Sequence, residues 1–165
     1  TSMSEQVSLQ TCNGETLDFE GETFDGGYSQ HVTMNIKNRK DFFLEAYRVL
    51  KKGTFFAFSE HGLGPEGNPI FPLPWADTSK MSFLLSPEST ISLLEEVGFY
   101  DIQIVETSKK YISGYEKMIN TKSKKENPIL GIHVIGGSTM KQRSINSMQC
   151  IKEKRTLPFE IVCKK

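Results

Sequence analysis

The stretch from residue 24 to residue 60 constrains the fold more than any other part of this 165-residue chain. An apolar segment at residues 24–28 is followed by a polar turn, and residues 38–50 then carry apolar side chains at helical spacing, up to Gly53. Residues 54–59 form a second segment whose unbroken apolar character is typical of a buried parallel strand. Two parallel strands joined by a crossover helix form a βαβ unit, so the sequence predicts an α/β fold with a parallel sheet.

Polar residues follow each of the two expected strands. Residues 29–31 (Ser-Gln-His) follow the first strand, and residues 60–62 (Glu-His-Gly) follow the second. Right-handed crossovers bring both strand ends to one edge of the sheet, where open α/β sheets bind their ligands. His31 and His61 therefore both fall where ligand chemistry is expected, although a mobile loop favours exposure of His61 to solvent. The third histidine, His133, is interpreted as structural.

The rest of the chain continues to alternate between helices and strands. Residues 60–81 form a long loop rich in glycine and proline, and because this loop holds large apolar residues such as Trp75, we expect an ordered lid. The other elements predicted from apolar spacing and end signals are a helix opened by Ser86-Pro87 and ended by Gly98, a strand around 102–104, helices at 111–119 and 145–151, and a last strand at 159–163. This order and length predict a single α/β domain over residues 1–165.

Composition excludes several classes of partner. Lysine plus arginine and aspartate plus glutamate number 20 each, so the formal charge of zero gives no reason to expect nucleic acid as a partner. No apolar run approaches the length of about 20 residues that spans a bilayer, so no membrane partner is expected. The three cysteines lie far apart without a C-x-x-C or Cys/His spacing. They predict reduced thiols, a cytoplasmic location and no metal site.

Several segments resemble one family of enzymes. Residues 17–25 (LDFEGETFD) resemble the L-P-F-x-x-x-x-F-D segment of class I S-adenosylmethionine-dependent methyltransferases. Residues 30–35 and 46–53 are similar to segments of the sarcosine/dimethylglycine N-methyltransferases, and residues 72–76 (PLPWA) resemble the substrate lid of that group. The resemblance implies a Rossmann-like sheet, mostly parallel with an antiparallel last strand and flanked by helices. It also implies S-adenosylmethionine as cofactor and methyl transfer to a glycine-derived amine on the way to betaine.

The resemblance begins only at about Asn13. In this family a glycine-rich turn after the first strand holds the methionine end of the cofactor, and an acidic residue after the second strand holds the ribose. The only G-x-G-x-x-G of this sequence, at residues 62–67 (GLGPEG), lies in the expected long loop, and residues 136–138 (Gly-Gly-Ser) are also in the wrong place to substitute. We therefore expect the chain to be the C-terminal part of a methyltransferase domain with the first strands missing. The resemblance implies an adenine-side half-site formed by Asn13, Gly14, Leu17, Ser29 and Gln30, in which Asn13 replaces the family's aspartate and still offers a carbonyl acceptor.

The expected acceptor side of the site is built from five residues. The resemblance implies a catalytic role for His31 in orienting cofactor or substrate; a structural role in the turn is the alternative. Tyr28 and Trp75 can form a cation–π wall for a methylated ammonium, although a tryptophan in a loop can equally cover the core. Asn35 resembles a pocket position of the family, or it begins the helix. Glu60 either balances the charge of the amine or caps a turn.

A second hypothesis assigns no catalysis to the chain. A sheet without its first strands leaves the strand at residues 24–28 as an open apolar edge, and such edges pair with other chains. On this view the chain is a truncated methyltransferase that acts, if at all, through self-association. In either case we expect a homodimer that covers this edge or the side of the lid.

Overall fold

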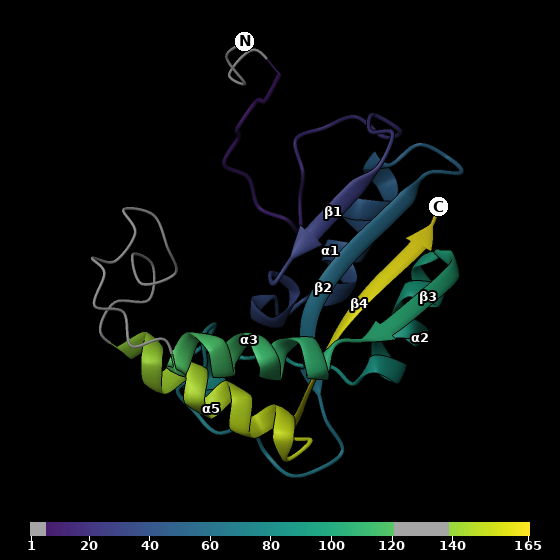
Figure 1. Cartoon of the computed structure of the whole chain (residues 1–165). Helices are drawn as coiled ribbons and strands as arrows, with labels where there is room; N and C mark the ends of the chain where they lie inside the picture. The colour runs from purple at the N-terminus through teal and green to yellow at the C-terminus, as the bar shows by residue number, and fades with distance from the viewer. Residues whose placement is uncertain (1–5, 121–138) are drawn as a thin grey trace.

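The computed structural model describes residues 6–120 and 139–165. They form a four-stranded sheet flanked by helices (Figure 1). The elements in chain order are β1 (Gly27–Gln30), the 3-10 turn η2 (Thr33–Asn35), α1 (Arg39–Val49), β2 (Phe55–Leu63), the 3-10 turn η3 (Ser79–Met81), α2 (Pro87–Val97), β3 (Tyr100–Glu106), α3 (Ser108–Asn120), α5 (Met140–Lys152) and β4 (Thr156–Lys164). His133 and residues 136–138 lie outside the described residues.

The order of the strands in the sheet is β1-β2-β4-β3. β1 and β2 are parallel, with Gly27 opposite Phe56, which confirms the βαβ unit expected at residues 24–60. β4 is antiparallel to both of its neighbours, β2 and β3. Three strands therefore run in one direction and only the last runs against them, which confirms the predicted mixed α/β sheet.

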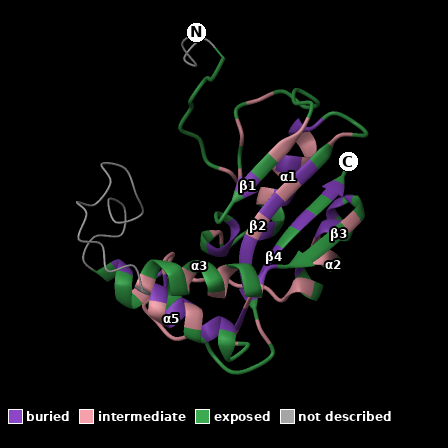
Figure 2. Cartoon of the chain, viewed as in Figure 1, coloured by how far each residue is buried: buried purple, intermediate pink, exposed green. Residues whose placement is uncertain are grey.

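The hydrophobic core lies between the sheet and the helices α1 and α2, which both pack behind it in the view of Figure 1. Phe56 and Phe58 of β2 contact Phe43 of α1, with ring centroids 6.4 and 5.4 Å apart. Strand alternation turns the intervening residues to the other face, so buried and exposed positions follow one another along β4 (Figure 2). On that second face Tyr28 and Val162 remain 78 % and 46 % exposed.

Helix α2 shows how local signals set the ends of an element. The side chain of Ser86 caps the helix by accepting a hydrogen bond from the backbone N–H of Ser89 at 3.2 Å, and Pro87 occupies the first turn. At the other end Gly98 has a φ of +114°, a conformation that favours glycine. Both predicted ends of this helix are confirmed.

The predicted ends of the first two strands are less accurate. β1 begins at Gly27, and Phe24 forms only an isolated bridge with Leu50. β2 continues to Leu63, so residues 60–62, which were expected to begin the long loop, belong to the strand. The reason is long-range: β4 pairs with β2 along its whole length, up to Thr156 opposite Leu63. The loop predicted at 60–81 therefore begins at residue 64, four residues later than expected.

The loop after β2 is held against the rest of the molecule by side-chain hydrogen bonds. Arg143 of α5 donates to the carbonyl of Leu73 at 2.8 Å, and Asn146 donates to that of Pro72 at 3.0 Å. Helices α3 and α5 lie side by side across the lower end of the sheet in Figure 1, joined by a hydrogen bond from Ser147 to Tyr115. Loop and helices together enclose the region beyond the carboxyl ends of β1 and β2.

Candidate functional site

A cavity of about 710 Å³ lies at the carboxyl ends of β1 and β2, between the loop after β2 and helix α3. We call it the aromatic pocket. Most of its exposed wall is apolar. The described residues that line it are His31, Met34, Asn35, His61, Pro74, Trp75, Lys110, Tyr111, Gly114, Tyr115, Met118 and Met140.

His31 occupies the position directly after β1, as expected from the sequence. Its backbone has a φ of +53°, and its N–H donates to the carbonyl of Ser59 on β2 at 2.9 Å. A positive φ at a residue other than glycine is strained and recurs at ligand sites.

The ring Nε2 of His31 lies 2.7 Å from the hydroxyl of Tyr111 on α3. Burial lowers the pKa of His31, and burial, followed by the nearby charge of Tyr115, raises the pKa of Tyr111 to about 12. The pair is therefore uncharged at neutral pH.

His61 is buried, which contradicts the exposure expected for it. It is only 2 % exposed because β2 continues through this position, so the residue is part of the sheet. Its ring stacks on Trp75 at 4.7 Å between centroids and lies 5.7 Å from His31. Burial, then the neighbouring His31, lowers the pKa of His61 to about 3. Its buried Nδ1 has no hydrogen-bond partner among the described residues, so a protonated ring would bury an N–H without an acceptor.

Tyr28 and Trp75 do not form the wall that the sequence suggested. Tyr28 projects from the open face of the sheet and does not line the aromatic pocket. Trp75 does line it, with its indole N–H donating to Ser82 Oγ at 3.0 Å. The aromatic partners come from α3 instead: Tyr111 and Tyr115. Their i, i+4 spacing places both on one helix face, and this signal in the sequence could have identified them.

Glu60 lies on the opposite side of β2 from the pocket, so its assignment to the substrate is wrong. Its side chain is fully buried and pairs with Arg39 of α1 at 2.9 Å. The hydroxyls of Thr33 and Thr90 also donate to this carboxylate. Burial raises the pKa of Glu60, and Arg39 opposes that shift. The charge of Glu60 is therefore neutralised inside the protein and is not available to a ligand.

Asn35 reaches the pocket and also holds the loop over it. Its amide donates to the carbonyls of Trp75 at 2.8 Å and Met81 at 3.2 Å. Helix α1 begins after Asn38, so Asn35 does not cap it. The pocket position suggested by the resemblance fits this placement better than the alternative of a helix start.

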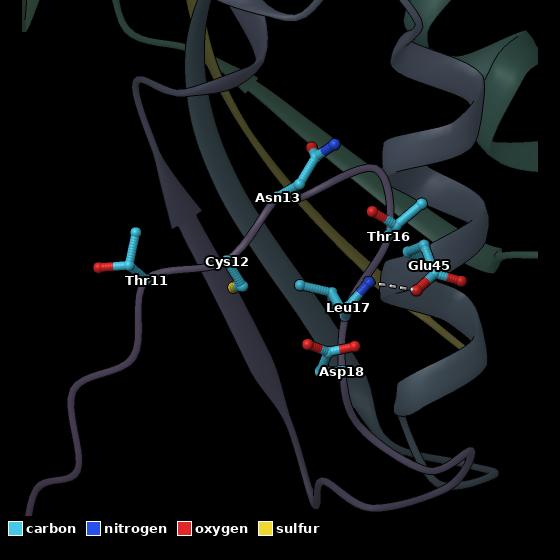
Figure 3. A pocket seen from close by; sticks show the side chains of 7 residues that line it. All are labelled: Thr11, Cys12, Asn13, Thr16, Leu17, Asp18 and Glu45. Atoms are coloured by element: carbon cyan, nitrogen blue, oxygen red, sulfur yellow. Dashed lines mark hydrogen bonds between the residues drawn. The ribbon is translucent and has the colours of Figure 1, made fainter.

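Four of the five residues expected on the adenine side surround two hollows beside β1. One, of about 460 Å³, is lined by Asn13, Leu17 and Glu45 among others (Figure 3). The other, of about 350 Å³, is lined by Gly14, Leu17 and Ser29 among others. Gln30, at the end of β1, is exposed and lines neither of them.

The loop that carries these residues is fixed to α1. The backbone N–H of Leu17 donates to Glu45 at 2.7 Å, the bond drawn in Figure 3, and Arg48 donates to the carbonyl of Leu17 at 2.9 Å. Hydrogen bonds from Arg48 and from the Leu17 N–H lower the pKa of Glu45 to about 2. The side-chain carbonyl of Asn13 accepts from the N–H of Glu15 at 3.0 Å.

These hollows combine an apolar wall with hydrogen-bonding groups. A Cβ at Gly14 would lie only 3.0 Å from the ring of Phe42, so the loop approaches α1 as closely as glycine allows. Leu17 supplies an apolar wall shared by both hollows. Asn13 keeps its side-chain N–H₂ and a second lone pair of its carbonyl for a ligand. The residues present therefore offer the apolar contact and the hydrogen-bonding groups that the adenine side of a nucleoside cofactor needs.

Two other kinds of site receive no support from the described part of the chain. Within residues 6–120 and 139–165 no group of three or more histidine, cysteine or acidic side chains can hold a metal ion. In the same ranges no helix is both long and apolar enough to cross a membrane.

Comparison with known proteins agrees with this fold. Residues 2–58 match the family model described as a methyltransferase domain. A putative sarcosine dimethylglycine methyltransferase from Galdieria sulphuraria superposes with a TM-score of 0.77 at 15 % identity, over 99 % of this chain and 61 % of the other. The chain has a methyltransferase fold. Phosphoethanolamine N-methyltransferase 2 of Haemonchus contortus, in complex with S-adenosyl-L-methionine, shares this fold with a TM-score of 0.71 at 16 % identity, over 93 % of this chain and 36 % of the other.

A curated relative adds similarity in sequence. The chain is 35 % identical over 101 residues to the biotin biosynthesis bifunctional protein BioHC of Teredinibacter turnerae, a match over 58 % of this chain and 17 % of the relative. The chain spans less than two thirds of the length of each of these three relatives. The methyltransferase fold that the resemblance implied is confirmed, and the fold leaves the substrate open.

Proposed function

We propose that the protein transfers a methyl group from S-adenosylmethionine to a small-molecule amine. The observation that supports this best is the placement of two sites at one strand end. Ser29, on β1, lines the hollow that fits an adenine ring, and His31, two residues later, lines the aromatic pocket. A donor in the first site and an acceptor in the second would meet at the carboxyl end of β1, where α/β folds bind ligands.

The described residues have distinct roles in this proposal. Bound S-adenosylmethionine supplies an electrophilic methyl group, so the protein has to align the amine, exclude water and give the amine's proton a route out. The hydroxyl of Tyr111 and Nε2 of His31 share a hydrogen bond of 2.7 Å, in which the donor depends on the tautomer of His31. In the tautomer with the proton on Nε2, that nitrogen donates to Tyr111, and the lone pair of Nδ1 is left to accept the proton of the amine. Because His31 also reaches solvent, it can pass the released proton to water.

The resemblance narrows the acceptor to a glycine-derived amine, such as sarcosine or dimethylglycine. The likeness to the Galdieria structure supports this narrower proposal. Lys110 at the rim of the pocket offers a positive charge to the carboxylate of such an amine, although it is 73 % exposed and lies near Glu160.

Calorimetric titration of the 165-residue chain with adenosine and with S-adenosylmethionine tests the cofactor assignment. Since the chain contributes adenine-side residues, we expect the two ligands to bind with affinities within about tenfold of each other. Leu17→Asp, which puts a charge into both hollows, should abolish binding, whereas Leu9→Asp at a position 91 % exposed should not. Absence of binding by both ligands would contradict the proposal. If the cofactor binds, an assay of methyl transfer to sarcosine tests the acceptor.

Self-association is a second candidate function, favoured by the open face of the sheet. Tyr28, Phe55 and Val162 are 78 %, 52 % and 46 % exposed, and β1 pairs on one side only within the described sheet. Large exposed apolar residues beside a free strand edge favour contact with another chain. We propose a homodimer through this face, compatible with catalysis or replacing it. A cytoplasmic location stays a prediction from the cysteines, all three of which are free.

A further inference from the structure

We propose that the aromatic pocket takes an amine with a largely apolar body, bound in its uncharged form, in preference to a small zwitterion. This inference rests on the proposed methyl transfer, and it names a class of acceptor other than the glycine-derived amines to which the resemblance narrows it. It follows from the size of the cavity, the chemistry of its walls and the placement of charges around it.

The cavity is large for a glycine-derived amine. Its volume of about 710 Å³ lies in the range that holds drug-sized ligands, and a molecule with only a few non-hydrogen atoms would leave most of it to water. Three thioethers line it from separate elements: Met34 of η2, Met118 of α3 and Met140 of α5. Methionine side chains adapt to irregular apolar shapes, so these walls suit a hydrocarbon body.

The charges around the cavity disfavour a cation. No aspartate or glutamate is among the described residues that line it, and the nearby carboxylate of Glu60 is engaged by Arg39 behind the strand. Lys110, the one lysine or arginine among those residues, repels an ammonium ion. Both histidines are neutral at physiological pH, since burial lowers the pKa of each. An ammonium group would therefore lose its hydration without gaining an ionic partner.

A cation–π site does not replace the missing carboxylate. One face of Trp75 is covered by the ring of His61, which stacks on it with an interplanar angle of 28°. Tyr111 meets both His61 and His31 nearly at right angles, at 79° and 86°. The rings of His31, His61, Trp75 and Tyr111 thus contact one another, which reduces the ring faces open to a cation. They provide apolar contact area with a few neutral hydrogen-bonding atoms.

The fluorescence of Trp75 tests this inference without a cofactor, because Trp75 is the only tryptophan of the chain and lines the cavity. The 165-residue chain is titrated with N-methylcyclohexylamine and with sarcosine between pH 7 and pH 9. We expect the apparent Kd of N-methylcyclohexylamine to be at least tenfold lower than that of sarcosine. We also expect the apparent Kd of N-methylcyclohexylamine to fall about tenfold per pH unit, because the uncharged fraction of this amine grows.

A carboxylate in the wall of the aromatic pocket should reverse the preference for the uncharged form of the amine. Met118→Asp places a carboxylate at a position that lines the cavity and is 37 % exposed, so the variant can fold. It should remove the pH dependence and tighten binding of the protonated amine. Ser113→Asp adds the same charge to an exposed position of α3 outside the described lining. It should change neither the pH dependence nor the affinity for the protonated amine. Circular dichroism checks that both variants fold.

The outcomes separate this inference from the proposed function. Sarcosine binding as tightly as N-methylcyclohexylamine, a pH-independent Kd, or no change in Trp75 emission with either amine would overturn the inference. If N-methylcyclohexylamine binds as expected but neither amine accepts a methyl group from S-adenosylmethionine, the inference stands and the proposed function fails. If sarcosine binds more tightly and accepts a methyl group, the proposed function stands and the inference fails.

Discussion

The buried ion pair between Arg39 and Glu60 gives the sharpest quantitative prediction. The two side chains are 4 % and 0 % exposed, and the guanidinium also donates to the carbonyls of Thr33 and Phe83, at 3.0 and 2.7 Å. Arg39→Met keeps an extended side chain but leaves the Glu60 carboxylate in the interior without a cation. Breaking a buried pair from one side costs about 3–5 kcal/mol. Against a total stability of about 5–15 kcal/mol, such a loss would be large.

Urea unfolding followed by Trp75 fluorescence measures this loss. With an m-value of about 2 kcal/mol per molar urea, the midpoint for Arg39→Met should fall by about 2 M. The double variant Arg39→Met/Glu60→Gln removes the stranded charge while keeping an acceptor for Thr33 and Thr90. We expect it to recover about 2 kcal/mol of the loss, because replacing both members of a buried pair is far less costly than removing one.

Lys40 and Glu96 provide a control, because Lys40 follows Arg39 on α1 and pairs with Glu96 of α2 at the surface. Their side chains are 51 % and 58 % exposed, with 2.6 Å between Nζ and Oε1. Lys40→Met should cost no more than about 1 kcal/mol, as exposed pairs contribute little. Equal losses for Arg39→Met and Lys40→Met, or a double variant no more stable than Arg39→Met, would refute the argument from buried charge.

Four further predictions follow from single contacts. Because the pKa of His61 is about 3 in the folded state and about 6.5 unfolded, the unfolded chain gains a proton first on acidification. Unfolding at pH 5 should therefore need about 2 kcal/mol less than at pH 7.5, a difference that His61→Phe removes. Tyr111→Phe deletes the hydroxyl bonded to His31 and should slow methyl transfer about 2- to 10-fold in a radiolabelled-donor assay, with the melting temperature unchanged. Ser86→Ala removes the cap of α2 and should cost about 1 kcal/mol in urea unfolding, against almost nothing for an alanine elsewhere on the exposed helix face. Tyr28→Lys on the open face of the sheet should convert a dimer into a monomer in light scattering, and a monomeric parent chain would contradict that proposal.

Local signals predicted those parts of the fold that short segments of sequence determine. The crossover helix, the capped start of α2 at Ser86 and its stop at Gly98 each depend on neighbouring residues, and the structure confirms them. The direction of the β1–β2 pairing follows from the length of the connection between the strands. Of the candidate site, His31, Asn35 and Trp75 line the same cavity. Their roles toward a ligand stay predictions.

The positions of Glu60 and His61 show why the rest of the site could not be predicted. Both follow an apolar run and read as the start of a loop, but pairing with β4, about a hundred residues later, extends the strand to Leu63. Once the two residues are in a strand, their side chains have to point to opposite faces. Glu60 then points toward α1, where Arg39 neutralises it, and His61 points into the pocket, where Trp75 covers it. A single long-range pairing therefore reverses both expectations. Glu60, which was assigned to the ligand, is buried in the interior, and His61, which was assigned to solvent, lines the cavity.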